Sequence, residues 1–415
     1  MSPRLKLGVV FFSTVLTLML VLGAVTGQST DNERSAYRPL GVYTDVLAKI
    51  KSDYVEEPDM AKVTQGALQG LVEYLDPLSS YLSAEQYKVV QERRKNADGG
   101  SGLSTGLVIQ KRNSLTYAMS VLPGSPADEA GIRPGDYIEA LDGLSTRVMP
   151  PAYLHAMLSG QPGSTVTLLV RPARNPDEPI EKEIIRAAVS LPPVQHRMLE
   201  DGIGYLDVDV LTPEQVSQTA AAIKTLQSQG AEKYILDLRE TSWGDPAEGV
   251  RLANLFLGQG RIASLKGQQY PEKPFDAEKG SALTDAPVVV IADQFTAGGA
   301  EVAAAAILDN KRGQIAGQRT YGLAAVQETL PLEDGAALIL SVAKFYRPSG
   351  NAVQEGIEPS APLTPAELRR YRTAEMEEED APPPTEPPAE QAEDPFLRRA
   401  IELLRNGISA MPKAA

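Results

Sequence analysis

The chain has 415 residues, which is enough for two or three domains that each have a core. Acidic residues outnumber basic ones, 54 against 40, and this balance argues against nucleic-acid binding, which needs clustered cations. The absence of cysteine excludes disulfides, thiolate metal sites and a cysteine nucleophile, and two histidines are too few for a histidine-rich zinc site. We expect neither a metal nor a cofactor.

The N-terminus indicates export. Arg4 and Lys6 precede the apolar run LGVVFFSTVLTLMLVLGAV, and the chain then becomes polar at TGQSTDNERS. A charged head, an apolar core and small residues at the end are typical of an export signal. The run of roughly 19 apolar positions also approaches the ~20 that span a bilayer. Residues 1–27 are therefore predicted to be a signal peptide or a membrane anchor, with the remainder in the periplasm or cell envelope.

Periodicity and composition divide the remainder into further segments. Residues 28–99 show helical spacing of apolar residues, and the break DGGSGLSTG then opens a strand-rich domain at 100–190. Residues 191–372 alternate strands with helices, which predicts a mainly parallel sheet. Residues 373–394 are acidic and proline-rich and predict a disordered linker before a C-terminal helix within 395–415. The predicted fold class is multi-domain α/β.

Local signals place several elements of the larger domain. The segment TPEQVSQTAAAIKTLQSQG predicts a helix capped by Thr212, with Gln215 completing a capping box and Gly230 ending it. KYILDLR and APVVVIA predict buried strands. The Asp334-Gly335 pair predicts a hairpin between the alternating runs AVQETLPL and AALILSVAKFY.

The segment VLPGSPADEAGIRPGDYIEALDG predicts two strands around a short helix that Ser125 caps and Gly131 ends. This string resembles the core of a PDZ domain, in which it follows a carboxylate-binding loop and an exposed strand. The resemblance assigns that role to the upstream STGLVIQ. A simpler interpretation, which we keep open, is that STGLVIQ is only the first strand of a sandwich.

A groove of this kind would bind an extended peptide by adding it to a sheet edge, with the peptide's carboxylate in a nest of backbone N–H groups. Gly106 would let the backbone approach that anion. The residues expected to contact the peptide are Ser104, Thr105, Gly106, Leu107 and Val108 of the loop and strand, and Leu154 and Met157 of the helix in PPAYLHAMLSG.

Taken together, the motifs resemble the carboxyl-terminal processing, or tail-specific, proteases. The likeness begins at LDPLSSYLSAEQY, in which Leu78 stands where the family has His, and continues through GIGYLDVDVLTPE, YILDLRE, GVRLANLFLGQG, ILDNKRGQIAGQRTYG and VQETLPLEDGAALILSVAKFYRPSGNAVQEGIEP. The resemblance implies a PDZ domain beside a crotonase-like mixed αβ core, and the activity of a serine-type endopeptidase.

The residues that carry the family's chemistry differ here. The family's catalytic serine lies three residues before the glutamate that matches Glu301, which is Gly298 in this chain. The family's lysine in Arg-Thr-Phe-Gly-Lys-Gly corresponds to Leu323 in RTYGLAAVQ, and the offset 323 − 298 = 25 agrees with the family's spacing. A third family residue, glutamine, is retained as Gln327, for which we expect a structural role.

These replacements predict a chain without the catalytic pair. A serine is a poor nucleophile until a base takes its proton, and a desolvated lysine serves as that base. Glycine offers no attacking atom and leucine accepts no proton. The oxyanion region ETSWGDP also departs from the family, because Trp243 stands at the first glycine position and disfavours a preorganised N–H, although Gly244 is retained.

The leading hypothesis is therefore an exported, oligomeric family member that binds extended peptides or protein C-termini, or modulates an active relative. The alternative is an active serine-type endopeptidase with relocated catalytic residues, for which Thr296 and Ser242 are the candidate nucleophiles. A third possibility is a structural envelope protein with a closed groove.

Overall fold

The computed structural model describes residues 29–96, 103–371 and 394–406. The predicted export segment lies outside these residues, and so does the predicted linker except for Asp394. The chain divides into two compact units, residues 1–67 and 68–415, which are described separately. In the first unit, helix α2 spans Ser29–Asp53 and helix α3, Met60–Glu73, begins. No helix within the described residues is long and apolar enough to cross a membrane.

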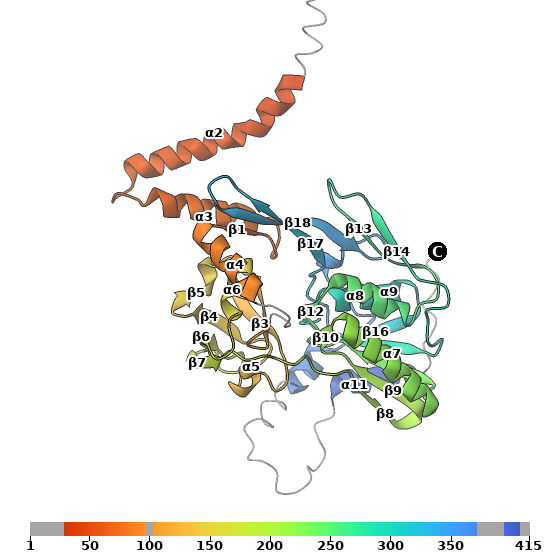
Figure 1. Cartoon of the computed structure of the whole chain (residues 1–415). Coiled ribbons are helices and arrows are strands. Elements are labelled where there is room, and N and C mark those ends of the chain that lie inside the picture. Colours follow the sequence, from red (N-terminus) through yellow and green to blue (C-terminus); the bar gives the residue numbers. More distant parts are fainter. Residues whose placement is uncertain (1–28, 97–102, 372–393, 407–415) are drawn as a thin grey trace, which may run out of the picture. The chain divides into compact units, whose positions relative to one another are not determined.

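The larger domain of the second unit contains a six-stranded sheet in the order β19-β16-β15-β11-β9-β8. Strands β16, β9 and β8 of this sheet are labelled in Figure 1. The strands of the sheet are β8 (Gln195–Met198), β9 (Ile203–Asp207), β11 (Lys233–Asp237), β15 (Val288–Ala292), β16 (Gly313–Gly317) and β19 (Ala361–Pro362). All neighbours pair in parallel except β8 and β9. The expected mainly parallel sheet, with strands at KYILDLR and APVVVIA, is confirmed.

Alternating side chains of this sheet pack against helices on both faces. Tyr234 and Leu236 belong to the core shared with α7 (Pro213–Ser228), α8 (Pro246–Asn254) and α9 (Gly299–Asp309). Ile235, between them, belongs to the core shared with α11 (Pro395–Arg405). Thr212 caps α7 as predicted, since its hydroxyl accepts a hydrogen bond from the Gln215 N–H.

A second, antiparallel sheet has the order β1-β18-β13-β14, with β17 also paired to β18. Its strands are β1 (Ser80–Leu82), β13 (Arg261–Lys266), β14 (Lys273–Asp276), β17 (Ala325–Pro331) and β18 (Ala337–Tyr346). The hairpin predicted at Asp334-Gly335 is confirmed. Strand β1 lies in a region for which only helices were predicted, because its three residues pair with a strand more than 250 positions later and carry little local signal.

The small domain has a sheet in the order β2-β3-β4-β6-β7, with β5 paired to β4. These strands are β2 (Leu107–Arg112), β3 (Leu115–Val121), β4 (Tyr137–Leu141), β5 (Leu144–Ser145), β6 (Thr165–Arg171) and β7 (Ile180–Ile185). The helices are α5 (Pro126–Glu129), capped by Ser125 as predicted, and α6 (Pro151–Leu158). Helix α4 (Ala84–Asn96) contacts α6. Since β2 is the edge strand among the described residues, one side of its backbone is unpaired within the sheet.

Candidate functional site

The turn between β15 and α9 holds Gly298 as the N-cap of the helix. Its φ of 63° and ψ of −119° lie in a region that glycine adopts readily and other residues rarely adopt. A sharp strand-turn-helix connection of this kind presents its central residue at the head of the helix, as in the nucleophile elbows of hydrolases. Position 298 therefore has a backbone conformation like that of a nucleophile elbow, but as glycine it carries no side chain.

Glu301 connects this turn to the segment that follows β16. Its carboxylate is fully buried and accepts hydrogen bonds from the backbone N–H groups of Gly298 (3.0 Å), Gly322 (2.7 Å) and Leu323 (2.7 Å), and from the Thr320 hydroxyl. Burial raises the pKa of Glu301 to about 7, and the hydrogen bonds oppose that rise. We call this group of contacts the Glu301 clasp.

The clasp brings Gly298 and Leu323 together. A Cβ built on Gly298 would lie 3.3 Å from the carbonyl oxygen of Leu323. The Leu323 side chain is 8% exposed and packs with Ala297 of the turn and with Val108 and Met119 of the small domain. The two positions to which the resemblance assigns the nucleophile and the base are therefore adjacent, and position 323 is in apolar surroundings.

The segment expected to form the oxyanion region carries the large side chain of Trp243. Trp243 is partly buried and packs against the cluster around Leu323. Gly244 pairs with Leu211 in the short parallel ladder of β10 (Val210–Leu211) and β12 (Trp243–Gly244). A Cβ on Gly244 would lie 2.0 Å from the Leu211 carbonyl oxygen, so glycine is required there by packing.

Gln327 lies apart from the Leu323 cluster, on the exposed part of β17. Its side-chain amide donates a hydrogen bond of 2.7 Å to the carbonyl oxygen of Leu78. This contact ties β17 to the loop before β1. The glutamine is thus engaged with backbone, although with a loop rather than with a neighbouring strand.

The two candidate replacement nucleophiles have different surroundings. The Thr296 side chain is completely buried. Its hydroxyl oxygen lies 2.8 Å from the Leu238 carbonyl and 3.0 Å from the Asp293 carboxylate, which share its single proton, and it accepts from the Asp293 N–H. The Ser242 hydroxyl is buried and has no hydrogen-bond partner within the described residues. No hydrogen bond joins either hydroxyl to a lysine or histidine in that part of the chain.

The loop expected to bind a carboxylate uses its polar groups internally. The Ser104 hydroxyl donates to the Leu158 carbonyl and accepts from the Gly160 N–H, and the Thr105 carbonyl accepts from the Ala127 N–H. Gly106 has a φ of 73°, and its N–H donates to Leu103. We expected Gly106 to admit an anion, but a Cβ there would lie 2.1 Å from the Cβ of Ser125. The glycine is therefore required by close packing on the cap of α5.

The apolar groove residues also differ from expectation. Leu107 and Leu154 are each 1% exposed and belong to the core of the small domain, so they do not line an open groove. Met157 is partly buried at the margin of that core. Val108 is buried against Ala297 and Leu323. The edge backbone of β2 is unpaired within its sheet, but residues 107–111 are all buried, so this edge is covered in the structure.

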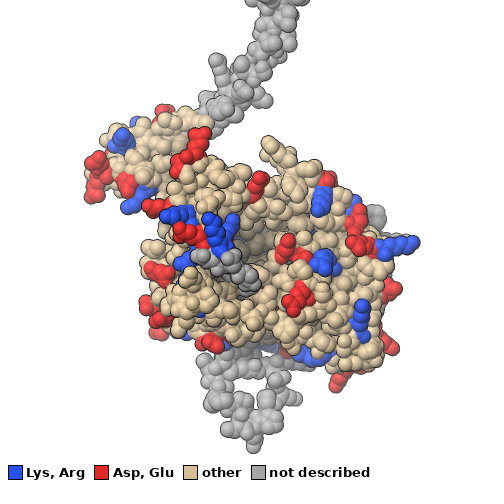
Figure 2. Space-filling model, in the orientation of Figure 1, with Lys and Arg blue, Asp and Glu red and all other residues tan. Residues whose placement is uncertain are grey.

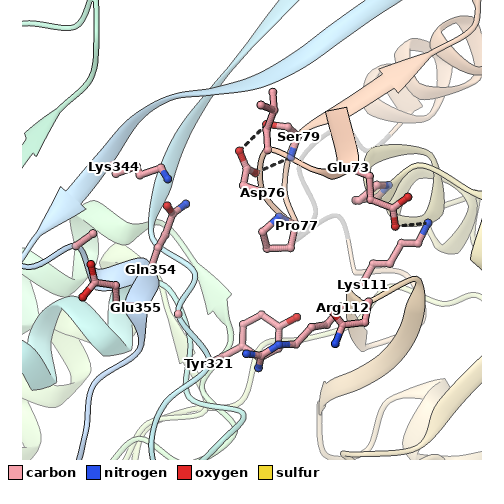
Figure 3. Close-up of a pocket in the computed structure, with 15 residues that line it drawn as sticks. Glu73, Asp76, Pro77, Ser79, Lys111, Arg112, Tyr321, Lys344, Gln354 and Glu355 are labelled. Atoms are coloured by element: carbon pink, nitrogen blue, oxygen red, sulfur yellow. Dashed lines mark hydrogen bonds and ion pairs between the residues drawn. The ribbon is translucent and has the colours of Figure 1, made fainter. Parts of the chain in front are cut away.

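A cavity of about 490 Å³ lies near the Glu301 clasp (Figure 3). Its lining comes from the end of α3 and the loop before β1, from the β2–β3 hairpin, from the start of α6, from the loop after β16, and from β18 and the segment that follows it. The Tyr321 hydroxyl and the Gln354 side-chain nitrogen, both in its lining, are buried and lack hydrogen-bond partners among the described residues. These are donors that a ligand could satisfy.

Charges of both signs are interspersed on the described surface in Figure 2. This face has no broad field of one sign within the described residues. Across those same residues, no group of three or more His, Asp or Glu side chains is placed to hold a metal ion.

Comparison with known proteins supplies the class. Peptidase family S41 matches residues 202–363, and the PDZ domain matches residues 117–172. The carboxy-terminal-processing protease of Bartonella bacilliformis is 32% identical over 361 residues, covering 85% of this chain and 81% of that protein. The carboxy-terminal processing protease CtpA of Bacillus subtilis is 29% identical over 378 residues, covering 89% and 79%.

Among solved structures, the photosystem II D1 C-terminal processing protease is similar with a TM-score of 0.62. It is 23% identical, and the match covers 79% of this chain and 93% of that one. Fold and site together define a PDZ domain joined to a serine-peptidase scaffold. The chain belongs to the carboxyl-terminal processing protease family.

Sequence reasoning missed two features of the site. It did not connect Val108 with Leu323, because that contact joins residues more than 200 positions apart. It also did not single out Tyr321, although this residue replaces the phenylalanine of the family's Arg-Thr-Phe-Gly-Lys-Gly and thereby adds a hydroxyl to the cavity. A comparison of that motif position by position would have found it.

Proposed function

We propose that this chain is a non-catalytic member of its family that binds extended peptides or protein C-termini. The observation that carries the proposal is that Gly298 and Leu323 lie next to each other. Glu301 accepts hydrogen bonds from the backbone N–H groups of both residues, while their side chains offer neither a nucleophile nor a base. Trp243 in the oxyanion region supports it further. Peptide binding needs a strand edge, and β2 has one that is unpaired in its sheet. Because residues 107–111 are buried, binding there requires the segments that cover β2 to move aside.

The purified full chain tests this proposal. We expect no covalent labelling by a serine-directed fluorophosphonate and no cleavage of an unstructured protein, together with binding of extended peptides measured by fluorescence anisotropy. The matched control is the same peptide with alternate amides N-methylated, which cannot pair with a strand edge. Labelling that disappears in Thr296→Ala or Ser242→Ala would instead establish the relocated active site. Equal binding of both peptides would contradict strand addition.

We also propose that the protein is exported across the cytoplasmic membrane and is either free in the periplasm or cell envelope or anchored to the membrane. This proposal rests on the charged and apolar pattern of residues 1–27, which lie outside the described part of the chain. Fractionation of cells with the full chain, followed by N-terminal sequencing of the mature protein, separates a cleaved signal from a retained anchor.

We further propose that the protein is an oligomer, or pairs with an active relative, through its N-terminal helices. Within the first unit, Val42 of α2 is 63% exposed and Val55, in the bend between α2 and α3, is 86% exposed, values that are high for branched apolar side chains. We expect the full chain to sediment as more than a monomer, and Val42→Glu/Val55→Glu to shift it toward monomer. A wild-type monomer at all concentrations, with or without an active family protease, would contradict this.

A further inference from the structure

We propose that the cavity of Figure 3 binds a carboxylate of the peptide, and so gives the protein a preference for acidic or free-ended chains. This inference rests on the proposed peptide-binding function and adds a site to it. The cavity is separate from the loop at 104–106, whose polar groups are already used internally.

The lining of the cavity includes basic side chains that are not in ion pairs and are available to bind an anion. The Lys111 ammonium is committed, because it donates to the carbonyls of Arg147 (2.7 Å) and Met149 (3.1 Å) and pairs with Glu73 at 3.3 Å. Arg112 and Lys344 also line the cavity, and neither has an ion pair within the described residues. The Arg112 guanidinium stacks over the Tyr321 ring, 5.5 Å from its centroid.

The acidic groups of the lining, by contrast, are engaged or directed elsewhere. The Asp76 carboxylate accepts from the N–H groups of Leu78 and Ser79 and from the hydroxyls of Ser79 and Ser341. Glu73 pairs with Lys111. Figure 3 shows the Glu355 carboxylate directed away from the other labelled groups. The lining thus holds three acidic and three basic side chains, and Arg112 and Lys344 are its two cations without an ion pair among the described residues.

The unsatisfied donors match an anionic oxygen ligand. The Tyr321 hydroxyl and the Gln354 amide nitrogen each lack a partner among the described residues, and burial makes an unmet donor costly. Burial also raises the pKa of Tyr321 to about 12, so the hydroxyl keeps its proton at neutral pH. A carboxylate accepts from neutral donors and from Arg or Lys at once, and such charge-assisted hydrogen bonds are the strong ones. A peptide carboxylate can come from a C-terminus or from an Asp or Glu side chain.

The test measures Kd by fluorescence anisotropy for four versions of one extended peptide on the full chain. They carry a free or amidated C-terminus, each with Asp or Asn at one internal position. We expect the peptide without any carboxylate to bind about ten- to hundredfold more weakly than the best acid. If amidation weakens binding, the cavity binds the C-terminal carboxylate. If Asp→Asn weakens binding, the cavity binds the Asp side chain.

Variants of residues in the lining test whether the preference for peptides with a carboxylate arises in this cavity. Arg112→Gln/Lys344→Gln should remove the preference for acids, and Tyr321→Phe, which keeps the ring under Arg112, should reduce it about three- to tenfold. Lys224→Gln is the control, since Lys224 is exposed on α7 and lies outside the lining. Binding that ignores carboxylates, or variants that behave as wild type, would overturn this inference while leaving peptide binding intact. No binding by any peptide would overturn both proposals.

Discussion

Replacing Glu301 with alanine is expected to lower the free energy of unfolding by about 3 kcal/mol or more. The substitution leaves the backbone N–H groups of Gly298, Gly322 and Leu323 without their acceptor in a fully buried site. Each buried unmet donor costs about 1–3 kcal/mol. Chemical denaturation of the full chain measures the loss.

Glu248→Ala is the matched control for that experiment. Glu248 occupies the third position of α8, as Glu301 does in α9, but its side chain pairs with the half-exposed Arg251. Glu248 is buried, but its partner Arg251 is half-exposed, and we expect loss of this pair to cost about 1 kcal/mol. Equal losses in the two variants would show that the clasp has no special role.

The pH dependence gives a second readout of the clasp. Burial raises the pKa of Glu301 from an ordinary 4.5 to about 7 in the folded protein. Between these values the folded state holds a proton that the unfolded state has released, so the contribution of Glu301 is complete below pH 4.5 and declines as pH rises through 7. Glu301→Gln does not titrate and should lack this decline. Parallel pH profiles for wild type and Glu301→Gln would contradict the assignment.

Restoring both family residues is expected to produce a large gain in the rate of covalent labelling. We expect Gly298→Ser/Leu323→Lys to react with a fluorophosphonate at least about a hundredfold faster than the wild type, because loss of the nucleophile alone costs about 10⁶ in turnover in a serine protease. A serine at 298 would have its Cβ near Leu323, as the 3.3 Å approach to that residue's carbonyl indicates. A lysine at 323 would enter apolar surroundings, which depress its pKa and favour a base.

Gly298→Ser/Leu323→Met is the control with a nucleophile and no base, and it should label slowly. Serine at a φ of 63° is strained by about 1–3 kcal/mol, so folding of each variant is checked by circular dichroism first. A folded double variant that stays unlabelled would contradict the register that places 298 and 323 at the family's positions. Rapid labelling of the wild type would contradict the proposed loss of catalysis.

Local sequence signals predicted much of the fold. The capped helix after Thr212, the hairpin at Asp334-Gly335 and the buried strands of the parallel sheet all depend on neighbours in sequence, and all formed as expected. Strand β1 was missed because its hydrogen bonds go to β18. Contacts between segments far apart in the sequence produce no local pattern of residues from which they could be predicted.

The site shows the same division. The adjacency of 298 and 323 followed from the spacing of family motifs, since those motifs encode one turn and one loop. The burial of Leu107 and Leu154 could not be predicted from the strand and helix that carry them, because it depends on how closely α6 packs on β2. The burial of the unmet donors of Tyr321 and Gln354 likewise arises only when segments far apart in the sequence meet around the cavity.

One contact has a thermodynamic implication for the whole chain. Val108 belongs to the edge strand that we expect to receive a peptide, and its side chain is also buried against Leu323 and Ala297. A peptide that displaced this strand would have to uncover apolar surface on the turn at Gly298. Peptide binding and the packing of that turn are then coupled, and the coupling free energy is the same in both directions. Measured peptide affinity would therefore also report how firmly the turn at Gly298 is held.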